Sequence, residues 1–211
     1  MDDIVSGIQS EERRAGIALS NTQRDGLLHY IGLLQKWGKK VNLTANPSPE
    51  AIVSRHLPDA LYLYRKMAID MDLQTDSTFV DVGSGAGLPG LLIGILFPEL
   101  STTLVESISK KCTFIRTVCH ELHLRNVTVV NKRLEQADIQ KADLVSSRAT
   151  WDPEEWLERA GSLLKAGGIA VVFTAGELAL EVEPLGYILQ SRVKYSLMDG
   201  AGRVQTYLIR R

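Results

Sequence analysis

Residues 78–94 read Thr-Phe-Val-Asp-Val-Gly-Ser-Gly-Ala-Gly-Leu-Pro-Gly-Leu-Leu-Ile-Gly, and this stretch decides the fold. Phe79 to Val82 is short, mostly apolar and partly β-branched, which predicts a buried strand. Glycines follow at positions 83, 85, 87 and 90. Pro89 and the apolar run 91–93 then predict the start of a helix, because proline is tolerated in a first turn. Glycine lets a ligand approach the backbone closely, and a helix N-terminus offers free N–H groups, so the stretch predicts a ligand site.

The acidic residues around the glycines indicate which ligand fits. The string 85–90 matches the dinucleotide fingerprint GxGxxG, which alone is a weak signal. Asp81 stands directly before the glycines, and a second predicted strand at 102–106 ends in Glu106. Such folds present a carboxylate to ribose hydroxyls about twenty residues after the turn. This combination is typical of Rossmann-like S-adenosylmethionine (SAM) methyltransferases, and it assigns to cofactor binding Asp81, Gly83, Gly85, Gly87 and Glu106. The alternative for Asp81 is a turn or helix cap, with the glycines forming only a tight turn.

Length, charge and cysteine content limit the classes of protein to which the chain can belong. A chain of 211 residues with net charge −1 and pI ≈ 6.4 fits one domain with an elaboration. It has no overall basic character, so a nucleic acid would have to be held by a local patch. Cys112 and Cys119 lie about two helical turns apart, too far for a disulfide, and two cysteines supply no metal cluster. The N-terminus lacks the order of a signal peptide, and the longest apolar run is too short to span a bilayer. We therefore expect a cytoplasmic protein with no metal and no membrane partner.

Alternating strand and helix patterns predict an α/β fold whose mostly parallel sheet carries helices on both faces. The expected strands are 79–82, 102–106, 127–130, 143–146 and 169–173, followed by an antiparallel edge hairpin at 192–197 and 204–209. The expected helices of the core run to about 97, from 109 to 124 and from 151 to 164, the last ending at Gly167-Gly168. We expect a single domain, 1–211, in which 1–72 is an N-terminal helical extension and 73–211 is the cofactor-binding core. The extension contains helices at about 21–40 and 50–67, with Pro58 as an irregularity, whereas 1–20 is polar and weakly patterned and is interpreted as a frayed helix.

Ligands of such sheets bind at the carboxyl ends of the strands. Arg133, Leu134 and Glu135 follow the strand 127–130, where an adenine ring would lie. Arg148 follows the strand 143–146 and is expected at the reactive mouth, the alternative being an ordinary surface arginine.

His56 and Asp59 form a second polar pair, three residues apart on the helix predicted at 50–67. This spacing makes them neighbours in space. We favour a structural hydrogen bond between them over a catalytic pair, since nothing nucleophilic lies nearby in sequence.

Several motifs then occur in an order that resembles a known family. They are Leu33-Leu34-Gln-Lys-Trp37-Gly-Lys-Lys-Val-Asn42-Leu43-Thr44, His56-Leu-Pro-Asp59-Ala-Leu61, Asp81-Val-Gly83-Ser-Gly85-Ala-Gly87-Leu88-Pro89-Gly90, Lys110-Lys111-Cys-Thr-Phe114-Ile-Arg116, Leu134-Glu135 and Ser147-Arg148-Ala149. Together they resemble the bacterial small-subunit ribosomal RNA methyltransferase G family, also called glucose-inhibited division protein B. The resemblance covers nearly the whole chain beyond the first 20 residues. The Asp-x-Gly-x-Gly-x-Gly part marks only the superfamily, whereas Gly-Leu-Pro-Gly, Asn-Leu-Thr and Ser-Arg-Ala are far more specific.

The resemblance implies a class I SAM-dependent methyltransferase that methylates N7 of one guanine of 16S rRNA, near the decoding region of the small ribosomal subunit. It also implies cofactor contacts from Gly83, Leu88, Leu134, Glu135 and Arg148. The chain departs from the family pattern at Gly38, Pro58, Ala60 and Ala175, where the family usually has Asn, Leu, Ser and Lys. The departure at Ala175 removes a cation that could contact RNA phosphate.

The implied chemistry fits a site without an obvious base. Guanine N7 has a lone pair and no proton, so its methylation needs alignment and no general base. Arg148 could orient the base through its O6 or bind the carboxylate of the cofactor, and the sequence leaves both roles open. N7 faces a deep and narrow groove in A-form RNA, so we expect an unpaired or distorted target. Cations that could follow the phosphates are Lys36, Lys39, Lys40, Lys110, Lys111, Arg116 and Arg203.

Two other functions stay open at this point. One is a SAM methyltransferase with another substrate, and the other is a nicotinamide-dependent oxidoreductase that uses the GxGxxG string. We expect a monomer, and the sequence does not distinguish bare RNA from an assembled subunit as substrate.

Overall fold

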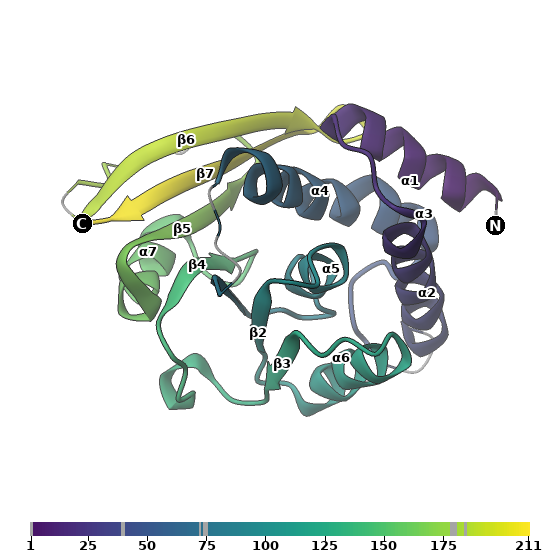
Figure 1. The fold of residues 1–211 in the computed structure, drawn as a ribbon, viewed down its shortest axis with the longest axis horizontal. Coiled ribbons are helices and arrows are strands. Elements are labelled where there is room, and N and C mark those ends of the chain that lie inside the picture. The colour runs from purple at the N-terminus through teal and green to yellow at the C-terminus, as the bar shows by residue number, and fades with distance from the viewer. Residues whose placement is uncertain (1, 39–40, 72, 74–75, 178–180, 184) are drawn as a thin grey trace.

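A seven-stranded sheet with the order β3-β2-β1-β4-β5-β7-β6 forms the centre of the molecule (Figure 1). The computed structural model describes residues 2–38, 41–71, 73, 76–177, 181–183 and 185–211, so Lys39 and Lys40 lie outside the described residues. The strands are β1 (Thr78–Val82), β2 (Ser101–Val105), β3 (Val127–Val130), β4 (Ala142–Ser147), β5 (Leu164–Thr174), β6 (Tyr187–Ser196) and β7 (Gly202–Arg210). β1 to β5 are parallel, whereas β7 pairs antiparallel with β5 and β6. The predicted parallel sheet with an antiparallel edge hairpin is confirmed.

Helices cover both faces of this sheet, because successive side chains of each strand point to opposite sides. On one face, Trp156 of α7 (Pro153–Leu163) packs in a cluster with Val80 and Val82 of β1. On the other face, α5 (Gly90–Leu96) and α6 (Ser109–Glu121) pack in a cluster that contains Leu104 of β2.

The N-terminal extension shares the apolar cluster of α5 and α6. It consists of α1 (Asp2–Ala15), α2 (Asn21–Gly38), α3 (Pro49–Ala51) and α4 (Leu57–Arg65), with π-helical turns at Ile52–His56 and Lys66–Asp70. Leu27 and Leu61 of the extension belong to the same cluster as Leu92 and Phe114. Figure 1 shows α4 and α2 beside α5, away from α7.

α1 forms from the polar stretch whose pattern was weak, and a pair of charges adds to the contacts of its few apolar residues, Ile8 and Ala15, with the core. Glu12 is buried. Arg24 of α2 donates from Nε and Nη2 to the two carboxylate oxygens of Glu12, each at 2.7 Å. A two-pronged pair of this kind fixes geometry as well as charge.

Pro58 produces the expected irregularity of the helix predicted at 50–67. Proline has no N–H and cannot donate to the carbonyl one turn earlier. The preceding residues adopt a π-helical turn in which the Leu57 N–H bonds the Ile52 carbonyl. Such turns insert an extra residue per turn and are frequent at functional sites. His56 ends this turn and Asp59 lies in the first turn of α4, so the irregularity sets where both side chains lie.

α7 is shorter than predicted. Its N-cap is Asp152, whose carboxylate accepts the Glu155 N–H at 2.9 Å, and it ends at Leu163. β5 starts at once at Leu164, so Gly167 and Gly168 lie within a strand and the predicted glycine stop of the helix is wrong.

The start of α5 lies against β1 and β2 with no room for a side chain at Gly90. A Cβ there would lie 2.5 Å from Leu104 Cδ2 and 2.6 Å from Asp81 Cβ. We expect Gly90→Ala to lower the free energy of unfolding by about 1–3 kcal/mol, because an inserted carbon strains a packed interior. Urea unfolding followed by circular dichroism measures the change.

The matched control is Gly32→Ala in the middle of α2. Gly32 is exposed, and no atom of the described residues would lie within 4 Å of a Cβ there. This variant should gain about 0.5–1 kcal/mol from helix propensity alone. A similar gain at Gly90 would contradict the close packing of α5.

Candidate active site

An open cleft of about 890 Å³ lies at the carboxyl ends of β1, β2 and β4. The glycine turn after β1, Glu106 after β2 and Arg148 after β4 all line it, as expected for this type of sheet. The residues predicted to bind the cofactor that line the cleft are Gly83, Gly85, Leu88, Glu106, Leu134, Glu135 and Arg148. Asp81 and Gly87 are not among its lining residues.

Gly85 is the glycine that leaves space for a ligand. Gly83, Gly85 and Gly87 have φ values of 72°, 59° and 88°, in the left-handed region that glycine tolerates. A Cβ at Gly83 would lie 2.3 Å from Thr150 Oγ1, and one at Gly87 would lie 2.5 Å from Leu91 Cβ. At Gly85 the nearest atom would be 3.9 Å away. Close packing therefore requires glycine at positions 83 and 87, whereas at position 85 the missing side chain leaves space in the cleft.

Glu106 ties the glycine turn to β2. Its Oε2 accepts the Gly85 N–H at 2.9 Å and its Oε1 accepts the Ile108 N–H at 2.8 Å. Each carboxylate oxygen still has a lone pair to spare. A carboxylate fixed in this way can accept the two hydroxyls of a ribose, so this end of the cleft fits a nucleoside cofactor.

Asp81 has a different role from the predicted cofactor contact. Its side chain is buried, with Oδ2 accepting the Gly90 N–H at 3.1 Å and Oδ1 accepting the Ser146 hydroxyl at 2.7 Å. Burial raises the pKa of this carboxyl to about 6, against the hydrogen bonds that lower it. Asp81 thus caps the start of α5, which was the alternative interpretation.

The opposite end of the cleft is a short turn at Leu134–Gln136. Leu134 is half-buried there and offers apolar surface. Arg159 Nη1 donates to the Glu135 carboxylate at 2.6 Å, and the Arg159 guanidinium lies 5.0 Å from the centre of the Trp151 ring. These contacts hold Glu135 at the rim.

The N-terminal extension also lines the cleft, which the sequence did not predict. Residues 43–46, Arg55 and His56 form this wall. The buried hydroxyl of Tyr30 on α2 donates to the Ala86 carbonyl of the glycine turn at 3.0 Å. The extension therefore braces the turn as well as covering it.

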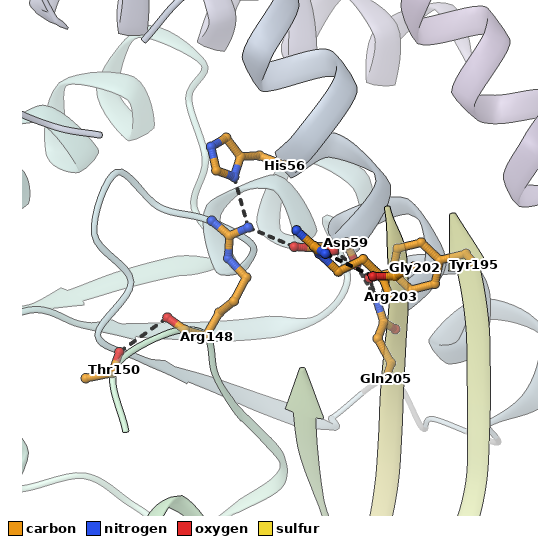
Figure 2. A network of polar contacts seen from close by, with 8 residues as sticks. All are labelled: His56, Asp59, Arg148, Thr150, Tyr195, Gly202, Arg203 and Gln205. Atoms are coloured by element: carbon orange, nitrogen blue, oxygen red, sulfur yellow. Dashed lines mark hydrogen bonds and ion pairs between the residues drawn. The ribbon is translucent and has the colours of Figure 1, made fainter. Parts of the chain in front are cut away.

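Arg148 is held by residues far away in sequence (Figure 2). Its Nη1 donates to Asp59 Oδ2 at 2.7 Å and to His56 Nδ1 at 2.9 Å. Instead of bonding one another as expected, His56 and Asp59 both hold Arg148. Tyr195 of β6 donates its hydroxyl to the other Asp59 oxygen, and Gln205 of β7 donates to the Asp59 main-chain carbonyl at 2.7 Å. The ion pair thus joins the core, the extension and the edge hairpin.

His56 is neutral in this arrangement. An arginine can only donate, so Nδ1 accepts and the ring proton resides on Nε2. Burial, together with the neighbouring cations Arg148, Arg55 and Arg203, lowers the pKa of His56 to about 4. The ring consequently adds no positive charge to the site at neutral pH.

Two further properties concern metals and membranes. Within the described residues, no three His, Cys, Asp or Glu side chains gather so that they could hold a metal ion. Of the helices in that part of the chain, none is both long and apolar enough to cross a membrane. Cys112 and Cys119 are free thiols.

The sequence model of the family described as rRNA small subunit methyltransferase G (GidB) matches residues 23–203. The chain belongs to this family. The ribosomal RNA small subunit methyltransferase G of Ectopseudomonas mendocina (strain ymp) is 42% identical, over 71% of this chain and 70% of its own length. The protein of the same name from Leptothrix cholodnii is 34% identical, over 87% of this chain and 82% of its own length.

A solved structure supports the fold separately. A SAM-dependent methyltransferase from Aquifex aeolicus superposes with a TM-score of 0.52 at 15% sequence identity, covering 69% of this chain and 88% of that one. The predicted Rossmann-like methyltransferase fold is thus confirmed. Family membership makes the chain a methyltransferase with SAM as cofactor, which decides against the oxidoreductase alternative.

The open space at Gly85 yields a test of the cofactor site. We expect Gly85→Val to weaken SAM binding by about tenfold or more, because the side chain would enter the cleft, a loss of about 1.4 kcal/mol or more. Isothermal titration calorimetry measures the dissociation constant. The matched control is Gly167→Val, which has φ 73° and no atom within 4 Å of an added Cβ. Both variants carry the strain of a left-handed valine, and only Gly85→Val should lose affinity. Equal affinity in the two would move the cofactor elsewhere.

The lowered pKa of His56 yields a test by pH. The unfolded ring binds its proton near pH 6.5 and the folded ring only near pH 4, so the unfolded state binds more protons between these values. Stability therefore falls as the pH decreases through this window. Asp81, whose folded pKa is raised to about 6, acts in the opposite direction and is unchanged by the substitution. His56→Gln keeps an acceptor for Arg148. As the pH is lowered from 7 to 4, we expect the difference in unfolding free energy between this variant and the original chain to shift by about 1–3 kcal/mol in favour of the variant. If the unfolding free energies of the variant and the original chain change in parallel with pH, folding does not lower the pKa of His56.

Proposed function

We propose that the chain transfers a methyl group from SAM to N7 of one guanine of 16S rRNA in the small ribosomal subunit. The observation that carries the proposal is the family match over residues 23–203. The geometry of the cleft supports a nucleophile that carries no proton. His56 and Asp59, the side chains best placed to act as bases, both have acceptor atoms engaged by Arg148.

Bound SAM would supply a methyl group attached to a sulfonium sulfur. The N7 lone pair forms the bond to the methyl carbon, the C–S electron pair stays with the departing sulfur, and no proton moves. The chain then has to hold and align the two reactants. Glu106 orients the ribose end through a carboxylate that two main-chain N–H groups fix. Gly85 leaves the space that the ligand occupies, and Leu134 packs against it at the other end of the cleft.

Arg148 orients the acceptor base in this proposal. It lines the cofactor cleft and also a second cavity next to it, so it stands between donor and acceptor. Asp59 holds it from the side of the extension. This position supports contact with guanine O6, the first of the two roles left open by the sequence, over a contact with the cofactor's carboxylate.

Cations at the two ends of the cleft support contact with RNA phosphates. Lys111, Lys132 and Arg133 line the cleft on one side, and Arg203 lines the second cavity on the other. Ala175, where the family usually has Lys, also lines the second cavity. The cation that the family usually has is therefore missing from the acceptor side, whereas the lining of the cofactor cleft is unaffected.

We further propose that the protein acts as a cytoplasmic monomer in which 1–72 is an extension of the catalytic core 73–211. The support is that residues of one chain supply every wall of the cleft, including its N-terminal wall. The two free thiols fit a reducing compartment.

Transfer of labelled methyl from SAM to purified small-subunit RNA, and separately to assembled subunits, tests the proposal. Borohydride and aniline then cleave the RNA at 7-methylguanine. We expect a single cleavage in the decoding region, and none with the Gly85→Val variant as control. SAM binding without labelled RNA would point to a methyltransferase with another substrate, and several cleavages would refute the single target.

A further inference from the structure

A second cavity of about 390 Å³ adjoins the cofactor cleft at the ends of β4 and β5. The residues that line both spaces are His56, Arg148, Ala149 and Trp151. Ala149 has φ 57°, a left-handed value that is uncommon for any residue other than glycine. Strain of this kind is often found at functional sites. The chain therefore makes its unfavourable turn at the place where the two spaces meet.

Ser147 lines the second cavity, and its hydroxyl is buried and unused. The residue is 7% exposed, it lines the cavity, and its Oγ has no hydrogen-bond partner among the described residues. Its neighbour Ser146, in contrast, donates to Asp81. A buried polar atom without a partner costs about 1–3 kcal/mol. A ligand with a polar edge would remove that cost.

The walls of the cavity fit a flat heterocycle. Trp156 and Val172 form a buried apolar floor, and Phe173 lies beside them. The polar lining residues include Ser147, Arg148 and Arg203. Apolar faces with a few placed polar groups are typical of sites for aromatic ligands, and the volume suffices for a purine base.

The charges around Arg148 suit a base that becomes positive. Methylation at N7 places a positive charge on the purine, which a free cation would oppose. Here the guanidinium is paired with the Asp59 carboxylate at 2.7 Å, and His56 is neutral. Nη1 carries both contacts, so the remaining N–H groups of Arg148 can still donate. The pair thus offers hydrogen-bond donors with little net charge.

We propose that the second cavity receives the target guanine base, turned out of its RNA, with Arg148 donating to O6 and Ser147 bonding the polar edge. This proposal rests on the proposed function and locates its acceptor. Arg148 donates only, so adenine, whose 6-amino group is itself a donor, is rejected. N7 lies next to O6, and a base that meets Arg148 by O6 therefore turns N7 toward the cofactor cleft. Arg203 on the outer wall then contacts a phosphate of the same strand.

Titration of guanosine 5′-monophosphate into the protein saturated with S-adenosylhomocysteine tests the cavity without turnover. The indole N–H resonances provide the readout, since Trp151 and Trp156 line the cavity and Trp37 packs on Phe114 elsewhere. We expect saturable shifts of Trp151 with guanosine monophosphate, none of Trp37, and at least severalfold weaker binding of adenosine monophosphate. No shift of Trp151, or equal binding of both nucleotides, would overturn the proposal.

Ser147→Ala and Ser191→Ala form a matched pair of variants. Both remove a hydroxyl whose Oγ is buried without a partner in the described structure, but only Ser147 lines the cavity. Neither should lose folding stability. We expect Ser147→Ala to weaken guanosine monophosphate binding by about 3- to 10-fold, the worth of one hydrogen bond, and Ser191→Ala to leave it unchanged. Unaltered binding in Ser147→Ala would remove Ser147 from the site.

The same variants separate this proposal from the proposed function. Ser147→Ala should raise the KM for RNA severalfold, with the affinity for SAM unchanged. If the original chain methylates the decoding-region guanine and Ser147→Ala does so with an unaltered KM, the cavity is misassigned and the function stands. If the original chain methylates no RNA, the proposed function fails, and the nucleotide titration then decides whether the cavity binds a guanine base at all.

Discussion

The buried carboxylate of Asp81 fixes the geometry on which the site depends. One oxygen holds the first N–H of α5 at Gly90, and the other holds Ser146 of β4. The chain between Asp81 and Gly90 is therefore anchored at both ends, and the turn that it makes is set by three glycines with positive φ. Glu106 then fastens the middle of the turn at Gly85. The cofactor side of the cleft follows from two carboxylates, one buried beneath the turn and one lining the cleft.

The Arg148–Asp59 ion pair organises the side of the site that is proposed for the acceptor base. Arg148 lies at the end of β4, and Asp59 reaches it from the extension because a π-helical turn before Pro58 sets the start of α4. Tyr195 and Gln205 support Asp59 from the edge hairpin. The Tyr195 ring also stacks on Tyr62 of α4, with 4.2 Å between the ring centres. The extension and the hairpin are therefore structural parts of the reactive mouth.

Local patterns predicted much of this architecture, and remote contacts account for the rest. The strands, the glycine turn, Glu106 and Arg148 follow from periodicity and from the rule that ligands bind at the carboxyl ends of parallel strands. The partners of Arg148 could not be predicted in this way, because Asp59 is brought to it only by the tertiary fold. Asp81 was recognised as an important acid, but spacing does not reveal whether a carboxylate points to a ligand or beneath a helix. α1 was predicted only as a frayed helix, because its buried apolar residues, Ile8 and Ala15, are few and the partner of Glu12, Arg24, comes from another helix.

The network around Asp59 has a consequence for biosynthesis. Most residues of the cofactor side lie between Tyr30 and Glu135, with Trp151 and Arg159 completing its rim, whereas the hydrogen bonds of Asp59 need Tyr195 and Gln205, which are synthesised later. A growing chain would thus acquire the groups that hold SAM well before the groups that hold Arg148 in place. On the proposed assignment of the two cavities, the donor side is synthesised before the acceptor side, whose network around Asp59 is complete only once β7 has been made.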